Sequence, residues 1–326
     1  MADFPAVKLH VVSGKGGTGK TTVAASLALA LAAGGRQVLL TEVEARQGIS
    51  QLFDTPPLPY EERRVAVARG GGEVYALAID PEQALLEYLE QFYNLRRAGS
   101  MLKKLGAIDF ATTIAPGLRD VLLTGKVMEA ATRERRGGGR LYDAVVLDAP
   151  PTGRIAKFLN VNTEVAALAR MGPVSKQANS VMELLQSPRT AVHLVTVLEE
   201  MPVQETADGV AELVATGLRP GAIVVNMVRD PLIPADRLAD AAAGTIDPAE
   251  LARGLKTAGL DDDATTVSAL ATEVTAHAQR VQLEQQELST LAALERPTYQ
   301  LPFVGDAAEL SGLQEIADRL QSEGMV

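Results

Sequence analysis

One stretch near the start of the chain limits its fold more than any other: residues 14–21 read GKGGTGKT. They fit the pattern G-x-x-x-x-G-K-[ST], whose glycines let consecutive backbone N–H groups turn inward around a phosphate group. An apolar run at residues 7–12 precedes the loop, and an alanine-rich segment without Gly or Pro follows it over residues 20–31. Strand, loop and helix in this order are what a phosphate loop requires, because the helix N-terminus adds its partial positive charge.

The loop also indicates which residues meet the ligand. Lys20 is expected to reach the β- and γ-phosphates of a nucleoside triphosphate, and the Thr21 hydroxyl to bind Mg²⁺. Lys15 is a second cation that an ordinary phosphate loop does not need, and it gives the variant form K-G-G-x-G-K-T. The residues of this segment that we expect to bind nucleotide are Gly14, Lys15, Gly16, Gly17, Thr18, Gly19, Lys20, Thr21 and Thr22.

Buried-strand patterns recur along the chain and predict an α/β fold with a doubly wound, mostly parallel sheet. Short apolar runs bounded by turn residues or helical periodicity indicate strands covered on both faces, and they lie at residues 38–40, 74–79, 144–147, 191–198 and 222–225. Two segments, about 81–135 and 154–190, are too long for simple crossovers and carry apolar residues at helical spacing. We therefore expect a single P-loop ATPase domain over residues 1–326, with a helical subdomain inserted at these two segments.

Three further segments have distinct patterns. The run of charges at residues 133–136, beside three glycines at 137–139, predicts a solvated loop. Residues 264–294 contain few helix breakers and predict a long helix. A last short strand is expected near residues 299–303.

Acidic residues end two of the predicted strands. Asp148 closes an apolar run and so lies at the carboxyl edge of the sheet, where doubly wound folds bind ligands. Together with the phosphate loop this is a Walker B position, whose carboxylate holds Mg²⁺ through water. Gly153, in the proline-rich segment that follows, is expected to sense the γ-phosphate. Glu42 and Glu44 close the second strand, and because they are two residues apart their side chains point the same way.

The base is predicted to be adenine. Guanine-binding proteins of this class need Asn-Lys-x-Asp, whereas here Asn226 is followed by Met, Val and Arg229, which stands where a guanine-reading carboxylate is required. The Asn226 side chain can still hydrogen-bond adenine, and Pro302, after the last strand, can pack on the ring. The expected cofactors are therefore ATP and Mg²⁺.

Together these motifs give the chain a resemblance to the ArsA-type ATPases. The variant loop is shared with a wider class that includes the MinD and ParA ATPases and the nitrogenase iron protein. The group itself includes the arsenical-pump ATPase and the targeting ATPase of the guided entry of tail-anchored proteins pathway, and the chain resembles a bacterial, actinobacterial-like member with one ATPase unit. The resemblance spans nearly the whole chain, and its motifs stand in the same order: the variant loop, Ile79-Asp80-Pro81, Asp148-Ala149-Pro150-Pro151-Thr152-Gly153, Val225-Asn226 and Leu301-Pro302.

The resemblance implies roles for single residues and for partners. Relatives have Asp-x-Asp where Glu42 and Glu44 stand, and the second aspartate orients or deprotonates the attacking water, so that role falls to Glu44. Relatives also use the first lysine of the loop across a dimer, which makes Lys15 catalytic together with Lys20, Glu44 and Asp148. Targeting-type relatives close a dimer with ATP and assemble a groove for a hydrophobic helix from a helical subdomain. The implied partners are a second copy or a paralogous ATPase, and a hydrophobic helix client or membrane protein.

Some family properties do not transfer to this chain. The arsenical pump binds metalloid through cysteines and the tail-anchor ATPase clamps its dimer with zinc through C-x-x-C, but this sequence contains no Cys. Glutamate at position 44 is one methylene longer than aspartate, which changes the geometry at the water. Met at helical spacing commonly fills cores, and we interpret four methionines of the helical segments as core residues before groove residues: Met101, Met128, Met171 and Met182.

Charge and hydropathy narrow the class of partner. The formal net charge is −10, from 31 Lys+Arg and 41 Asp+Glu, which disfavours attraction to nucleic acid or anionic lipid. No apolar run is long enough to span a bilayer and the N-terminus lacks a signal-peptide pattern, so we expect a cytoplasmic protein without a transmembrane segment. The leading interpretation is an ATPase that couples nucleotide-dependent closure to binding of a partner or hydrophobic client. Two alternatives are an ATPase subunit of an anion or metalloid efflux pump and a MinD- or ParA-like positioning ATPase.

The residue at position 229 generates a prediction about the base. ATP should bind more tightly than GTP, because the Arg229 guanidinium has no acceptor for the N–H groups of guanine. A competition titration with both nucleotides against a labelled ATP analogue measures the two affinities. Equal affinities would show that the argument from residue 229 is wrong.

Overall fold

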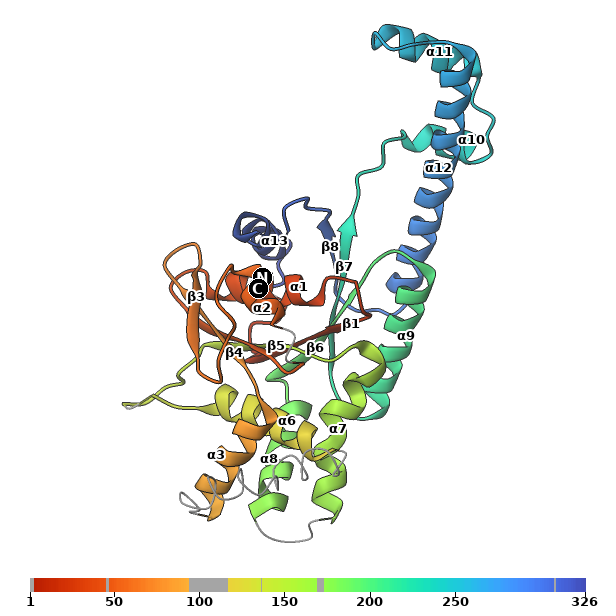
Figure 1. Ribbon diagram of the computed structural model, residues 1–326. Helices are drawn as coiled ribbons and strands as arrows, with labels where there is room; N and C mark the ends of the chain where they lie inside the picture. Colours follow the sequence, from red (N-terminus) through yellow and green to blue (C-terminus); the bar gives the residue numbers. More distant parts are fainter. Residues whose placement is uncertain (1–2, 45–46, 94–116, 136, 169–172, 308) are drawn as a thin grey trace.

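A single twisted sheet runs through the centre of the computed structural model, which describes residues 3–44, 47–93, 117–135, 137–168, 173–307 and 309–326 (Figure 1). In this part of the chain eight strands pair in the order β3-β4-β2-β5-β1-β6-β7-β8. Neighbouring strands are parallel except β3 and β4, which are antiparallel. The strands are β1 (Leu9–Gly14), β2 (Gln37–Glu42), β3 (Arg63–Val67), β4 (Glu73–Ala78), β5 (Ala144–Asp148), β6 (Thr190–Thr196), β7 (Pro220–Val228) and β8 (Thr298–Pro302).

Helices cover both faces of the sheet, so the predicted doubly wound α/β fold is confirmed. One apolar core lies between the sheet and α1, α2 and α13, and a second lies between the sheet and α6, α7, α8 and α9 (Figure 1). The helices on these faces are α1 (Lys20–Ala32), α2 (Gly48–Leu52), α3 (Pro81–Tyr93), α6 (Leu118–Thr132), α7 (Thr152–Leu168), α8 (Pro173–Gln186), α9 (Glu200–Ala215) and α13 (Leu310–Ser322).

Helix α1 is buried on all sides, which fixes where its N-terminus points. Every residue from Val23 to Ala32 is buried, because alanine side chains let the helix lie close to both the sheet and α13. The Gln321 side chain donates to the Ala30 carbonyl at 2.9 Å and ties α13 to the end of α1. A helix enclosed in this way cannot tilt freely, so its first turn stays at the carboxyl end of β1.

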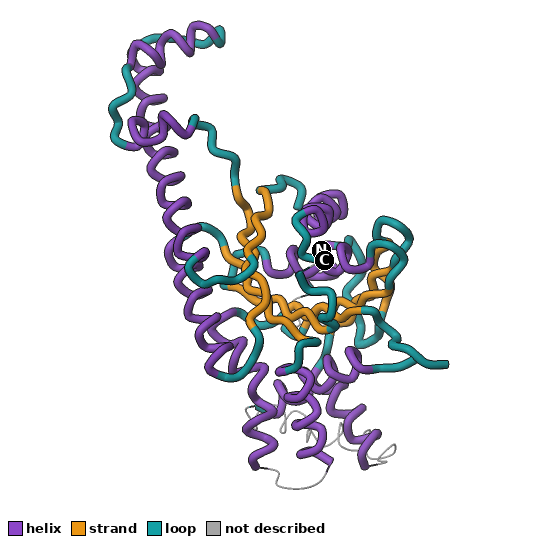
Figure 2. Tube along the Cα trace, turned by 180° about the vertical axis from the view of Figure 1, so that it is seen from behind, coloured by secondary structure: helices purple, strands orange, loops and turns teal. Residues whose placement is uncertain are grey.

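The two segments expected to be helical contain α3 with α6, and α7 with α8, and these helices lie together on one side of the sheet (Figures 1 and 2). Met182 is buried in the core against the sheet, and Met128 is partly buried against the same core. Met101 and Met171 lie outside the described residues. The division of the chain into an ATPase domain with an inserted subdomain stays a prediction.

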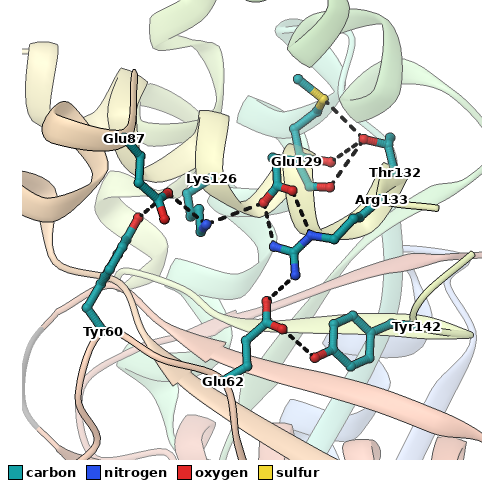
Figure 3. A network of polar contacts seen from close by, with 9 residues as sticks. Tyr60, Glu62, Glu87, Lys126, Glu129, Thr132, Arg133 and Tyr142 are labelled. Atoms are coloured by element: carbon teal, nitrogen blue, oxygen red, sulfur yellow. Dashed lines mark hydrogen bonds and ion pairs between the residues drawn. The ribbon is translucent and has the colours of Figure 1, made fainter. Parts of the chain in front are cut away.

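A polar network anchors α6 to the edge of the sheet (Figure 3). The Arg133 guanidinium contacts Glu62 at 2.7 Å and Glu129 at 2.6 Å, and Tyr142 donates to Glu62 at 2.7 Å. Burial and the Glu62 carboxylate raise the pKa of the Tyr142 hydroxyl well above its ordinary value. The prediction of a solvated loop over residues 133–136 is therefore wrong at Arg133, whose charge is satisfied by Glu129 one turn earlier and by Glu62, which is far away in the sequence.

A helical arm extends from the sheet beyond β7 (Figures 1 and 2). Its main helix, α12 (Ala264–Ala292), spans about 43 Å at the usual rise per residue. The Asp263 side chain caps the start of α12 by accepting from the Thr265 and Thr266 N–H groups. The long helix was predicted to end at residue 294 and ends at Ala292, and the last strand is Thr298–Pro302 rather than 299–303. The elements of the arm are η1 (Ala235–Arg237), α10 (Leu238–Ala242), α11 (Pro248–Thr257) and α12 (Ala264–Ala292).

Candidate functional site

The glycine-rich loop connects β1 directly to α1, and its glycines answer two separate demands. Gly17 and Gly19 have φ angles of +90° and +84°, a region that residues with a Cβ rarely adopt. Gly14 is needed for space, because a Cβ there would lie 2.3 Å from the Val195 carbonyl oxygen of β6. The Thr18 hydroxyl donates to the Lys15 carbonyl at 2.9 Å and closes the loop. The curve expected of a phosphate loop is thus present, with Gly16 exposed on it.

Asn226 fixes the loop from the other side. Its side-chain Nδ2 donates to the Thr18 carbonyl at 3.0 Å, and the residue is 4% exposed. A Cβ on Gly19 would lie 2.3 Å from the same Nδ2 atom. The amide nitrogen of Asn226 therefore supports the loop, a contact that sequence reasoning missed, and the expected contact of Asn226 with adenine stays a prediction.

The first turn of α1 brings the cationic and hydroxyl groups together. Lys20 is 9% exposed at the first position of the helix, and Thr22, two residues further on, is half-buried. The Thr21 hydroxyl donates to Asp148 Oδ2 at 2.7 Å. The helix N-terminus, the ammonium group and the threonine hydroxyl thus meet the end of β5, as the sequence pattern predicted.

Asp148 is a buried carboxylate, and one of its two oxygens has no hydrogen-bond partner among the described residues. Oδ2 accepts from Thr21, whereas Oδ1 is buried without a hydrogen-bond partner among the described residues. Burial raises its pKa to about 6, an effect that the Thr21 hydrogen bond and the Lys20 charge oppose and that Glu42 and Glu44 reinforce. An unpartnered buried oxygen beside a threonine hydroxyl fits Mg²⁺, which takes oxygen ligands and keeps several waters.

The two glutamates after β2 have different surroundings. Glu42 is 4% exposed and its carboxylate accepts from the backbone N–H groups of Gln47 at 2.9 Å and Ile49 at 3.2 Å. Glu44 is half-buried and lines a pocket of about 150 Å³ with Arg119, Asp120, Pro150 and Arg154. Glu42 is thus committed to holding the start of α2, and Glu44 is the carboxylate that faces a polar space.

The segment after β5 joins the loop to α7. The Ser13 hydroxyl donates to the Pro150 carbonyl at 2.6 Å and joins the end of β1 to this segment. Gly153 is exposed in the first turn of α7, and no atom of the described residues lies within 4 Å of the position that a Cβ would take. Helix α7 begins at Thr152, inside the proline-rich segment that follows Asp148.

A second pocket, of about 210 Å³, opens beside the loop on the side of β7 and β8. It is bordered by Asn226, Met227 and Phe303, and the Arg229 guanidinium lies 4.7 Å from the centre of the Phe303 ring. Arg280 and Glu284 of α12, which pair at 3.0 Å, complete the wall. The flat ring and the guanidinium suit a nucleobase.

Pro302, the residue that the sequence singled out, is half-buried just before Phe303. Phe303 was missed, and the signal that could have found it is an aromatic residue directly after the last strand in a chain with only six Phe.

Lys15 lies in the loop and is only partly buried. Its ammonium pairs with Glu205 of α9 at 3.0 Å, and the two side chains are 31% and 36% exposed. Sequence reasoning did not identify α9 or Glu205. The structure thus brings Gly14, Lys20, Thr21, Asp148 and Glu44 to one edge of the sheet, and it places the second loop lysine on an acidic partner in its own chain.

The sequence matches one family model, described as anion-transporting ATPase (ArsA ATPase), over residues 7–187. ATPase BagA of Mycobacterium tuberculosis is 51% identical over 319 residues, which cover 98% of this chain and 94% of the relative. ATPase GET3 of Kluyveromyces lactis is 27% identical over 67% of this chain and 71% of its own length. The arsenical pump-driving ATPase of Acidiphilium multivorum is 28% identical over 66% of this chain and 38% of its own length.

Two kinds of feature are absent from the described ranges. None of the helices there has the length and apolar composition that crossing a membrane requires. Within the same ranges, no three or more His, Cys, Asp or Glu side chains gather where they could hold a metal ion.

The raised pKa of Asp148 generates a prediction about stability. The folded chain binds the Asp148 proton more tightly than the unfolded chain, so the ionised group lowers the free energy of unfolding as pH rises from 3.8 to about 6, and the loss persists above that range. Asp148→Asn removes the charge and should stabilise the nucleotide-free protein at pH 7 by about 1–3 kcal/mol. Denaturant unfolding at pH 7 and pH 4 measures this, with no gain expected at pH 4. Destabilisation at pH 7 would contradict it.

The separate surroundings of Glu42 and Glu44 generate a second prediction. Glu44→Gln should keep ATP affinity and lower turnover about 10²-fold or more, the range for loss of a general base. Glu42→Gln should instead lower the free energy of unfolding by about 1–3 kcal/mol, because an amide cannot accept both backbone N–H groups with both of its polar atoms. Single-turnover hydrolysis and denaturant unfolding on both variants separate the roles. A normal turnover rate for Glu44→Gln would make it a structural carboxylate.

Proposed function

This chain belongs to the ArsA family of anion-transporting ATPases and is an ATP-hydrolysing enzyme, and we propose that two chains close on each other around nucleotide. Closure changes the affinity of the pair for a hydrophobic helix or a membrane-protein partner. The second chain is another copy or a paralogous ATPase. The similarity to ATPase GET3 supports this reading, and the proposed location is cytoplasmic, where ATP and Mg²⁺ are available.

The observation that carries the proposal is the arrangement of the two loop lysines. Lys20 is buried at the N-terminus of α1, beside the end of β5, and so serves the phosphates of its own chain. Lys15 lies on the surface of the loop, 3.0 Å from Glu205. A second cation that its own site does not need gains most by entering the site of a neighbour, where it neutralises charge as the γ-phosphate departs, as an arginine finger does.

The other groups then have the following tasks. Thr21, and Asp148 through water, would hold Mg²⁺, which would supply positive charge to neutralise the phosphates. Glu44 orients the attacking water and accepts its proton. Gly153 leaves room for the γ-phosphate against the N–H groups of α7. Adenine occupies the pocket between Asn226 and the Phe303 ring, beside Pro302.

Helices α6 and α7 are connected to this chemistry through the pocket that Glu44 lines. Arg119 and Asp120 come from the first turn of α6 and Arg154 from the first turn of α7. Burial raises the pKa of Asp120, and the nearby charges of Arg154 and Arg119 oppose that shift. A movement of the phosphate-sensing segment therefore changes an electrostatic contact at the base of both helices, which is a route from nucleotide to a client surface.

A role as the ATPase subunit of a metalloid pump has less support for this chain. The arsenical pump-driving ATPase is similar over 66% of the chain, but the sequence has no Cys to bind a metalloid. Hydrolysis that is unchanged by arsenite or antimonite agrees with the proposal, and stimulation by either favours the pump. A positioning ATPase that binds DNA is disfavoured by the net charge of −10, and binding of DNA at physiological salt would revive it.

Mixing two inactive variants tests whether Lys15 acts on a neighbouring chain. Lys15→Ala should keep nucleotide binding and lose hydrolysis, whereas Lys20→Ala should lose hydrolysis through its own site. When both are mixed, sites that combine Lys20 of one chain with Lys15 of the other should restore about a quarter of the wild-type turnover. About half of randomly formed pairs are mixed, and one of their two sites is complete.

The control is each variant alone at the same total concentration. If Lys15→Ala hydrolyses ATP like the wild type and the rate per chain does not depend on protein concentration, closure between chains is wrong. If a paralogue is the true partner, activity appears when that protein is added, and the same pair of variants then applies to the mixed complex.

A further inference from the structure

The ion pair between Lys15 and Glu205 connects the phosphate loop to a helix that takes no part in the chemistry described so far. Lys15 follows β1, and α9 follows β6 after a short connection. These strands are neighbours, with Gly14 in register with Val195, so the loop and the first turns of α9 meet at the carboxyl edge of the sheet. Glu205 is half-buried there, and its carboxylate lies 3.0 Å from the Lys15 ammonium.

We propose that Glu205 is a positioning residue that holds Lys15 on its own chain until a second copy of the chain closes on the phosphate loop. The inference rests on the proposed role of Lys15 between chains. A shared contact of the Lys15 ammonium with Glu205 and a neighbouring γ-phosphate would bring two anionic groups together, so the two contacts compete. Closure therefore requires that this ion pair breaks, and the triphosphate, with its higher charge, competes for the same ammonium.

The exposure of the pair suits a reversible hold. Both side chains keep about a third of their surface in water, so each is readily solvated when the other leaves, and exposed ion pairs stabilise only modestly. Breaking one ion pair of this strength lowers the association constant of the dimer up to about fivefold. A symmetric dimer breaks two such pairs, so the association constant falls up to about 25-fold. The resting chain is thereby kept from closing without nucleotide, while ATP can still overcome the hold.

The surface beside the pair agrees with a second chain as the partner. Met201 lies one turn before Glu205 on α9, so the two side chains are neighbours on the helix surface, and Met201 is 59% exposed. This methionine lies next to a lysine that must leave its partner. When another chain covers the methionine, its burial stabilises the closed pair. Closure thus exchanges a surface ion pair for an apolar contact and a phosphate contact.

Glu205→Gln tests the proposal, with Glu212→Gln as the matched control. Glu212 is an exposed glutamate two turns further along α9, so the control removes the same charge without touching Lys15. Sedimentation velocity with Mg²⁺ and a non-hydrolysable ATP analogue measures self-association, and turnover is followed against protein concentration. Glu205→Gln should tighten association up to about 25-fold and shift half-maximal turnover to lower protein concentration, with the plateau rate unchanged.

The double variant Lys15→Ala/Glu205→Gln separates a positioning role from a structural one. With Lys15 absent, Glu205→Gln should no longer change association, because there is nothing left to hold. If Glu205→Gln behaves like Glu212→Gln while the wild type self-associates in the presence of nucleotide, the positioning role of Glu205 is wrong and the proposed closure stands. If Glu205→Gln weakens association, Glu205 supports the closed state and the inference is overturned. If the wild type stays monomeric, closure between copies fails as well.

Discussion

The close approach of β6 and β7 to the glycine-rich loop is the constraint on which the rest of the site depends. Gly14 lies too near the Val195 carbonyl to carry a side chain, and Gly19 lies equally near the Asn226 amide, 2.3 Å from a Cβ position in each case. The loop is therefore enclosed on two sides by strands that the sheet order places beside and beyond β1. Its N–H groups need little ordering when phosphate arrives, so binding energy is not lost in shaping the loop.

The carboxylates around that loop differ in their roles because they differ in burial and in the hydrogen-bond donors that contact them. Glu42 accepts two backbone N–H groups and serves the fold. One oxygen of Asp148 accepts from the Thr21 hydroxyl, the other has no partner among the described residues, and burial raises the pKa of the carboxyl to about 6. It is thus a charge that the folded chain holds at a cost until a cation approaches. Glu44 faces a pocket with two arginines, where a water and its proton have room.

The sequence predicted the parts of the site that depend on local order. The phosphate loop, α1 and Asp148 at a strand end each follow from a few adjacent residues, and the structure puts them together as expected. Contacts between distant segments could not be read in this way. Glu205 meets Lys15 because β1 and β6 are neighbours, and Arg133 meets Glu62 across the edge of the sheet. The edge strand β3 was missed because its sequence, RRVAV, carries two arginines and has a solvent-facing side.

The two lysines of the loop show how one motif can supply both a fixed and an exchangeable charge. Lys20 is the first residue of α1 and is 9% exposed, so its ammonium stays at the site of its own chain. Lys15 lies five residues earlier on the exposed face and is held by a carboxylate that water can replace. Coulomb attraction is weak between exposed groups and strong in a site that closure has emptied of water. The same lysine therefore contributes little to the resting chain and much to a closed pair, and that difference is what makes closure depend on nucleotide.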